Sequence, residues 1–212
     1  MKKMFLDIET IPAEKEKHAI LKEIHQRKVD KGKPIGSFEE FVEGTGLDGA
    51  FGRIACISFA FDDEKVETLY GDEKEMLKKF WKAAERADLF IGFNLMDFDL
   101  RFIYQRSILF GVKPSKELNF ARYRNSPIYD IMYEWSKWNS QNKISLDTLA
   151  KAMGLPSSKG GEVEGSNVGK AYEEGKIAKI CEYCEKDVEL TRKIYKRMIF
   201  EDTKEEVNEE LF

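Results

Sequence analysis

A long apolar run followed at once by a second β-prone run does most to limit what this chain can fold into. Residues 53–61 are strongly apolar, residues 65–70 form the second run, and the acidic triplet between them indicates a hairpin turn. Helical and strand-like spacing then alternate, with expected helices at 73–87 and 98–110 and expected strands at 89–93 and 127–132. This order predicts an α/β fold, a mixed sheet of antiparallel hairpin strands and parallel strands flanked by helices.

The remaining segments complete this order. Residues 4–8 predict a first strand, residues 13–29 an amphipathic helix, and the Gly- and Lys-rich residues 30–51 a loop. We further expect a helix at 146–153 capped by Ser145, a loop at 156–170 and a long helix at 177–198. A chain of 212 residues fits one domain, here residues 1–200 with an insertion at about 12–51, and residues 201–212 form an acidic C-terminal tail.

Net charge alone does not indicate binding to nucleic acid. The chain carries −4, but the last 12 residues hold six acids and one lysine, which leaves residues 1–200 at about +1 (−4 minus −5). Residues 101–125 hold six Lys and Arg against one Glu. This segment fits either a locally basic face or an ordinary solvated surface.

The sequence carries no sign of export or of a membrane segment. The start, MKKMFLDIET, lacks the apolar core of a signal peptide, and no run of about 18 apolar residues occurs. Three cysteines give no disulfide framework. We therefore expect a cytoplasmic protein without a membrane partner.

Acidic residues occur at three positions where a mixed α/β sheet could present them to a metal ion or a ligand. Asp7 and Glu9 lie two apart at the end of an apolar strand, so both side chains point to one face of the sheet, where a divalent cation would relieve their repulsion. Asp99 follows a buried strand at a turn into a helix, with Asp97 expected to cap that helix. Tyr183 and Asp187 share one helix face, one turn apart. Taken singly, each feature also fits surface acids, a helix cap or a local hydrogen bond.

Taken in order, the three features resemble a known motif set. Strand-Asp-x-Glu, then Asn94-x3-Phe98-Asp99, then Tyr183-x3-Asp187 are similar to the motifs of the DEDDy exonucleases. Residues 52–58 and 144–155 resemble one branch, the 3′–5′ exonuclease domain of family B DNA polymerases and its stand-alone relatives, which has an RNase H-like fold. The resemblance runs from about residue 4 to residue 198, and it covers the insertion less well and the acidic tail not at all.

This resemblance implies a role for each motif residue. Asp7, Glu9 and Asp187 would bind one divalent cation, Asp7 would bridge to a second, and Asp99 would hold that second ion largely through water. Hard oxygen ligands favour Mg²⁺ or Mn²⁺. Tyr183 would orient the attacking water. The sister class has histidine where Glu182 stands, and the two histidines, His18 and His25, lie in the insertion, so the tyrosine subclass is expected.

Further residues are candidates for contact with the substrate. Thr10 and Asn94 occupy positions that resemble substrate-contacting ones, although both are also ordinary turn residues. The run Arg122-Tyr123-Arg124 interleaves charge with an aromatic ring. This pattern suits binding to single-stranded nucleic acid, but it also fits an ordinary exposed loop. Cys181 and Cys184 form a C-x-x-C pair, but suitably placed partners for zinc are absent, so both are expected to be small core groups.

The resemblance implies a metal-dependent phosphodiester hydrolase that removes nucleotides from the 3′ end of single-stranded DNA. An RNA-processing exonuclease with the same metal site is the main alternative, and a non-catalytic RNase H-like binding module is another. An aspartyl-phosphate phosphatase would need Asp-x-Asp, whereas Glu9 stands at the second position. The chain is too short for the polymerase palm and fingers, so any proofreading or DNA repair role would require a replication or repair partner acting in trans.

Overall fold

The computed structural model describes residues 1–139, 141 and 143–201, and the acidic tail from residue 202 on lies outside these. Its centre is a five-stranded sheet in the order β3-β2-β1-β4-β5. The strands span β1 (Lys3–Ile11), β2 (Arg53–Phe61), β3 (Glu67–Tyr70), β4 (Leu89–Gly92) and β5 (Ile128–Asp130). β1, β2 and β3 pair antiparallel, whereas β4 pairs parallel with both β1 and β5. The predicted mixed sheet is therefore confirmed.

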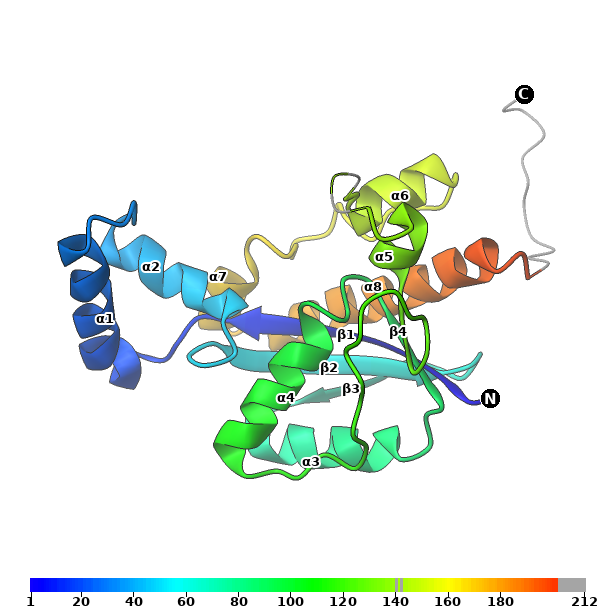
Figure 1. The fold of residues 1–212 in the computed structure, drawn as a ribbon, viewed down its shortest axis with the longest axis horizontal. Helices are drawn as coiled ribbons and strands as arrows, with labels where there is room; N and C mark the ends of the chain where they lie inside the picture. The colour runs from blue at the N-terminus through cyan, green and yellow to red at the C-terminus, as the bar shows by residue number, and fades with distance from the viewer. Residues whose placement is uncertain (140, 142, 202–212) are drawn as a thin grey trace.

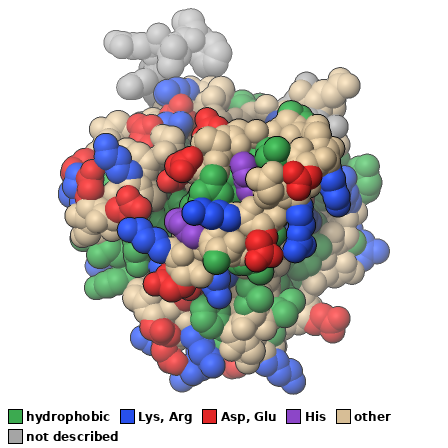
Figure 2. Space-filling model, turned by 90° about the vertical axis from the view of Figure 1, so that its left-hand side faces the viewer, with side chains coloured by type: hydrophobic (Ala, Val, Ile, Leu, Met, Phe, Trp, Pro, Cys, Tyr) green, Lys and Arg blue, Asp and Glu red, His purple; other side chains and the backbone are tan. Residues whose placement is uncertain are grey.

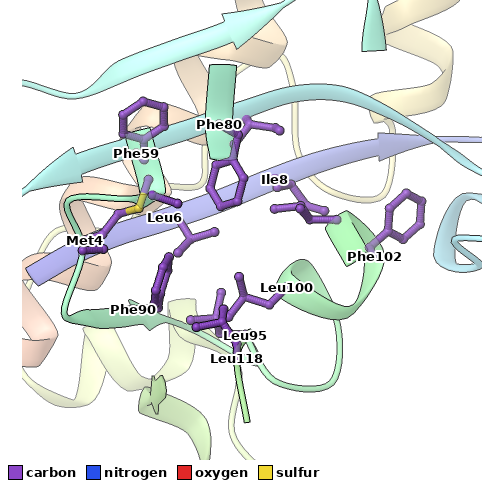
Figure 3. Close-up of a cluster of buried hydrophobic side chains, with 14 of the residues drawn as sticks. Met4, Leu6, Ile8, Phe59, Phe80, Phe90, Leu95, Leu100, Phe102 and Leu118 are labelled. Atoms are coloured by element: carbon purple, nitrogen blue, oxygen red, sulfur yellow. The ribbon is translucent and has the colours of Figure 1, made fainter. Parts of the chain in front are cut away.

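Helices cover both faces of this sheet (Figure 1). On one face, α3 (Glu73–Ala84) and α4 (Asp99–Phe110) pack on a large apolar cluster. Alternate residues of β1 enter this cluster, together with aromatic side chains from β2, β4 and the two helices, as Figure 3 shows for Met4, Leu6, Ile8, Phe59, Phe80, Phe90 and Phe102. β1 is thus fixed from one side by its even-numbered residues.

The opposite face of β1 meets the long helix α8 (Ile177–Met198), whose bounds agree with the predicted 177–198. Phe5 packs there against Val188, Ile194 and Tyr195. Further along the strand the same face passes over a third apolar cluster, which contains all three cysteines, Cys56, Cys181 and Cys184. The odd-numbered residues of β1 therefore face α8.

The insertion is more ordered than the sequence suggested. A 3-10 turn (Lys15–Lys17) leads into α1 (His18–Asp30), and α2 (Phe38–Gly44) and a second 3-10 turn η2 (Thr45–Leu47) lie within the segment that we expected to be a loop. α2 begins with a capping box, in which Ser37 accepts from the N–H of Glu40 and the Glu40 carboxylate accepts from the N–H of Ser37. Leu21 and Val42 join the two helices through a small core of their own. This pair of helices lies beyond the end of β1 (Figure 1).

Three short helices complete the fold. α5 (Ile131–Ser136) begins directly after β5, so the predicted strand at 127–132 was too long at its end. α6 (Leu146–Ala152) is capped by Ser145, whose hydroxyl accepts from the N–H of Thr148 as predicted. α7 (Val168–Glu173) begins inside the segment expected to be a loop and packs against α8 and β1.

Candidate active site

β1 carries two carboxylates on the face that meets α8. Asp7 lies opposite Ser58 of β2 and Glu9 lies opposite Cys56, after which a bulge between Glu9 and Thr10 shifts the register. Because the strand period is two, Asp7 and Glu9 project on the same side as Phe5. Glu9 is buried and Asp7 partly so. The end of the central strand therefore presents acids where an α/β sheet would otherwise continue its apolar core.

α8 brings the third carboxylate to this pair. Asp187 is buried, and one oxygen each from Asp7, Glu9 and Asp187 lies within 4.8 Å of the other two. Tyr183 lies one helical turn before Asp187 and is half-buried against the cysteine cluster. Four of the predicted residues, from two elements at opposite ends of the sequence, are thus gathered at one place.

Asp99 reaches the same strand from the start of α4. It is the first residue of α4, 3% exposed, and its Oδ1 accepts a hydrogen bond of 3.0 Å from the N–H of Ile8, between Asp7 and Glu9. Asp99 is not among the three acids that share the 4.8 Å cluster. The expectation that Asp97 caps this helix was wrong: Phe98 is at the cap position, and the Asp97 carboxylate accepts from the hydroxyl of Tyr133 instead.

The environment of the clustered acids disfavours their ionised form and so raises their pKa values. Burial raises the pKa of Asp7 well above its ordinary value, and the neighbouring carboxylates of Asp99, Glu9 and Asp187 raise it further. Burial likewise raises the pKa of Glu9 and of Asp187, while the hydroxyls of Ser158 and Tyr183 act against the shift at Asp187. Burial raises the pKa of Asp99 to about 7. A bound cation would reverse each of these shifts.

One atom indicates that the cluster fits a metal ion. Oδ1 of Asp187 is buried without a hydrogen-bond partner among the described residues. Buried carboxylate oxygens are normally satisfied, because desolvation without a partner is costly. Three converging hard oxygen donors, one of them unsatisfied, suit a divalent cation such as Mg²⁺ or Mn²⁺ better than a softer metal.

The hydroxyl of Tyr183 lies in the field of these carboxylates. Burial raises the pKa of Tyr183, and the negative charges of Asp187 and Glu9 raise it further. The phenol therefore keeps its proton over the whole neutral range. It is suited to orienting a ligand by hydrogen bonding and unsuited to removing a proton.

A pocket of about 370 Å³ opens beside Glu9. Its walls come from the end of β1, from η2 and from the start of α7, and they include Ile8, Thr10, Leu47, Phe98 and Gly165. Thr10 is tied to the insertion, because its hydroxyl donates to the carbonyl of Gly46 at 2.7 Å. Leu47 is 75% exposed. The insertion thus forms one wall of the cavity next to the carboxylates, a contribution that we did not predict from sequence.

The other predicted substrate residues lie outside this pocket. Asn94 adopts the left-handed conformation (φ 57) that asparagine tolerates, and its N–H donates to Asp130, so it forms a tight turn after β4. Arg122, Tyr123 and Arg124 are exposed on the loop between α4 and β5. None of these four residues lines the pocket beside Glu9.

The histidines are also remote from the cluster. His18 and His25 pack against Phe38, and His25 also packs against Phe41, within the α1–α2 pair. Figure 2 shows both imidazoles on one face of the molecule, among basic and acidic side chains. Their place in the fold gives them no part in the carboxylate site.

Some residues in or beside the site were not predicted from the sequence. Sγ of Cys184, one residue after Tyr183, lies 3.3 Å from Oδ2 of Asp7 and donates to it, which makes this buried thiol more than a space-filling group. Ser158 and Lys159, on the loop after α6, act to lower the pKa of Asp187, Ser158 through its hydroxyl and Lys159 through its charge. Asp130 accepts from the N–H groups of the turn that leads to Asp99. Cys184 is adjacent to a motif tyrosine in the sequence, but no local pattern indicates its contact with Asp7.

The arrangement of the whole chain resembles that of a solved polymerase. Over 94% of this chain, and 24% of the other, the fold matches the family B DNA polymerase of the hyperthermophilic archaeon Pyrobaculum calidifontis with a TM-score of 0.64 at 14% sequence identity. The chain thus spans about a quarter of that polymerase. The likeness shows the fold: the sheet and its helices have the architecture of a polymerase-type exonuclease domain, which is RNase H-like.

The sequence gives the family. Residues 47–211 match the family described as predicted 3′–5′ exonucleases related to the exonuclease domain of PolB, and the chain belongs to this family. The uncharacterized protein MJ0365 of Methanocaldococcus jannaschii is 25% identical over 167 residues, which cover 74% of this chain and 92% of that protein. The family match begins within η2, so Asp7 and Glu9 precede it. Membership supports an enzyme of the nuclease type.

None of the described helices combines the length and hydropathy needed to cross a bilayer.

Proposed function

We propose that this protein is a metal-dependent 3′–5′ exonuclease that hydrolyses single-stranded DNA by a two-metal-ion mechanism. The observation that carries the proposal is the convergence of Asp7, Glu9 and Asp187 on one site, with an unsatisfied buried oxygen on Asp187. The family to which the chain belongs supports the reaction. Its relation to a domain of DNA polymerases favours DNA over RNA as the substrate.

The carboxylates divide into two groups of ligands in this proposal. Asp7, Glu9 and Asp187 would hold the first ion, and Asp7 and Asp99 would hold the second. When bound, such ions stabilise charge on phosphoryl oxygens and lower the pKa of water. The carboxylates of Asp7 and Glu9 set the position of the site, because both are fixed on the central strand of the sheet.

Other side chains would position the reactants. Tyr183, whose raised pKa keeps the hydroxyl protonated, would orient the attacking water by hydrogen bonding. Lys159 lies on the loop beside Asp187 and is exposed, so its ammonium could reach a phosphate of the strand. Thr10 and Leu47 would form the wall against which the terminal nucleotide rests, because both line the pocket next to Glu9.

The experiment is to incubate the purified protein with 5′-labelled single-stranded DNA and RNA oligonucleotides in Mg²⁺, in Mn²⁺ and in EDTA, and to resolve the products on a sequencing gel. We expect a metal-dependent ladder that shortens from the 3′ end. Asp7→Asn, which keeps the shape of the side chain and removes its charge, should abolish the ladder. Asp63→Ala is the control, because Asp63 is an exposed acid of the β2–β3 turn with 75% of its side chain accessible.

The arms of the assay separate the alternatives. A stronger ladder on RNA would identify the RNA-processing enzyme, and an oligonucleotide with a blocked 3′ end should resist in either case. Binding without hydrolysis in any metal would leave the non-catalytic module. Hydrolysis that persists in Asp7→Asn would overturn the proposed mechanism.

A further inference from the structure

Three aromatic rings form a column that runs from the interior to the surface. The rings of Tyr133 and Trp138 are stacked, with centroids 4.7 Å apart and an interplanar angle of 13°. The ring of Tyr123 lies 5.2 Å from Trp138, tilted by 42°. Tyr133 is buried, whereas Tyr123 is 76% exposed. The outer end of the column therefore presents aromatic surface to solvent, where a further planar group can stack.

The backbone is bent to build this column. Tyr123 (φ 63), Lys137 (φ 48) and Trp138 (φ 64) are three of the six non-glycine residues with positive φ among those described. Such conformations cost free energy and persist where the surrounding structure imposes them, often at ligand sites. Lys137 and Trp138 directly follow α5, so this strain turns the indole back over Tyr133.

The inner end of the column is joined to the loop that carries Asp99. The hydroxyl of Tyr133 donates to the carboxylate of Asp97, two residues before Asp99. Asp130, which caps α5, accepts from the N–H of Asn94 at 3.1 Å and of Met96 at 2.9 Å. The aromatic column and the start of α4 are therefore held by one hydrogen-bonded turn.

Basic residues stand on the segments that carry the exposed ring and the rest of the column. Arg122 and Arg124 flank Tyr123 in the sequence and are exposed, as are Lys137 and Lys143. The ammonium of Lys143 lies 6.0 Å from the ring centroid of Tyr133. Single-stranded nucleic acid presents alternating phosphates and planar bases, and proteins bind it by combining cationic groups with stacked aromatic rings.

We propose that Tyr123 and Trp138, with Arg122 and Arg124, form a base-stacking platform that holds single-stranded nucleic acid outside the carboxylate pocket. Bases stack on the ring of Tyr123, and the two guanidinium groups meet the phosphates on either side. This inference rests on the proposed function for the identity of the strand, and it assigns that strand a second contact that takes no part in the hydrolysis.

The test measures binding separately from turnover. Fluorescence anisotropy with a 5′-fluorescein DNA 12-mer in Mg²⁺ is carried out on the Asp7→Asn protein, in which the strand should stay intact. Adding Tyr123→Ala should raise the dissociation constant about tenfold, with the slope of log Kd against log salt unchanged because no charge is lost. Arg122→Gln should instead reduce that slope by about one. Tyr70→Ala, at a 62% exposed tyrosine on the edge strand β3, is the matched control and should leave Kd unchanged.

An abasic 12-mer separates stacking from charge. It should bind more weakly than the DNA 12-mer and should be insensitive to Tyr123→Ala. Tyr123→Ala should weaken binding of an RNA 12-mer as much as binding of the DNA 12-mer, because both strands carry bases. Equal binding of the abasic strand, or a Tyr123→Ala protein that binds the DNA like the Tyr70→Ala control, would overturn the platform.

The two proposals fail in different ways. If the wild-type protein degrades the 12-mer while Tyr123→Ala changes neither Kd nor KM, the platform is wrong and the exonuclease stands. If the Asp7→Asn protein binds the bases through Tyr123 while the wild-type protein hydrolyses nothing in Mg²⁺ or Mn²⁺, the exonuclease is wrong and the platform stands. An Asp7→Asn protein that binds no 12-mer at all overturns the platform.

Discussion

Asp130 shows how one buried acid can organise a site that it does not enter. Its carboxylate is 2% exposed and accepts from three backbone N–H groups, those of Asn94, Met96 and Met132. These donors belong to the turn after β4 and to the first turn of α5. Without the carboxylate, the buried N–H groups of Met96 and Met132 and the partly buried N–H of Asn94 would lose their acceptor, which costs free energy at each.

We therefore expect Asp130→Ala to lower the free energy of unfolding by about 3 kcal/mol, measured by urea denaturation. Asp72→Ala is the comparison, because Asp72 also accepts from a helix N–H, that of Glu75 at 2.9 Å, but at an exposed cap. That change should cost about 1 kcal/mol. An equal decrease in the free energy of unfolding in the two variants would show that the turn does not depend on Asp130.

The buried acids also predict how stability varies with pH. Burial raises the pKa of Asp99 to about 7 and that of Asp130 to about 6, whereas the unfolded chain has aspartates near 4. Between these values the folded protein holds protons that the unfolded chain has lost, so stability must fall as pH rises. Surface acids with a lowered pKa, such as Glu182 at about 2, are ionised in both states from about pH 6 upward and do not alter the slope there.

The expected result is that the metal-free protein in EDTA is less stable at pH 8 than at pH 5, by an amount on the order of a few kcal/mol. Asp99→Asn should reduce the difference, because the amide oxygen can still accept from Ile8 while no charge is buried. Urea midpoints at the two pH values measure both quantities. A wild-type protein that gains stability towards pH 8 would contradict the raised pKa values.

Local spacing explains which candidate residues the sequence could reveal. Asp7 with Glu9, and Tyr183 with Asp187, are paired by the strand and helix periods themselves, so their shared faces follow once the elements are assigned. The hydrogen bond from the Cys184 thiol to Asp7 joins residues 177 positions apart, and no local pattern indicates it. The prediction that Asp97 caps α4 failed for a similar reason, because its carboxylate accepts instead from the hydroxyl of Tyr133, which belongs to another element.

At the scale of elements, the insertion was the least predictable part of the fold. Its Gly- and Lys-rich composition indicated a loop, yet α2 forms because Ser37 and Glu40 cap it and because its apolar residues pack on α1. The capping box could have been read from the sequence. The contact of η2 with the end of β1 could not, because it depends on how the insertion folds back.

Because Gly52 has no side chain, the start of β2 can lie close to the backbone of η2. A Cβ on Gly52 would lie 2.4 Å from the carbonyl oxygen of Thr45 and 3.1 Å from that of Asp48. We expect Gly52→Ala to lower the free energy of unfolding by about 1–3 kcal/mol, because it must push the backbone of η2 away. Since Leu47 lines the pocket, the same variant should also raise KM for an oligonucleotide.

Gly44→Ala is the matched control for this prediction. Gly44 ends α2 with helical dihedral angles (φ −59, ψ −19), and a Cβ there meets nothing within 4 Å. The change should stabilise the protein by up to about 1 kcal/mol and leave KM unaltered. Urea denaturation and steady-state kinetics measure both effects, and a Gly52→Ala protein as stable as the wild type would show that η2 yields without cost.

At the scale of the molecule, the carboxylate site joins the first strand to the last described helix. Asp7 on β1 and Asp187 on α8 are 180 positions apart (187 minus 7). β1 lies at the centre of the sheet and α8 packs along it, so the site can form only when the whole fold is assembled. A ligand of this site therefore binds the folded state and not the unfolded chain.

Mass action then predicts that Mn²⁺ stabilises the entire protein. At a free concentration of 100 times Kd, one bound ion should raise the free energy of unfolding by about 2.7 kcal/mol. The urea midpoint should move upward while the m-value stays constant, because the same surface is exposed on unfolding. The stabilisation should be larger at pH 8 than at pH 5, since the buried carboxylates must lose their protons before they bind the ion.

Two variants at the same strand make this prediction specific to the cluster. Asp7→Asn should remove the Mn²⁺-dependent stabilisation, whereas Thr10→Val should retain it, because the Thr10 hydroxyl is bonded to Gly46 and not to the acids. In EDTA, Asp7→Asn should be at least as stable as the wild type, since one buried negative charge is gone. Equal stabilisation of wild-type and Asp7→Asn protein by Mn²⁺ would mean that the ion binds elsewhere, and that the convergence of β1 and α8 is not the metal site.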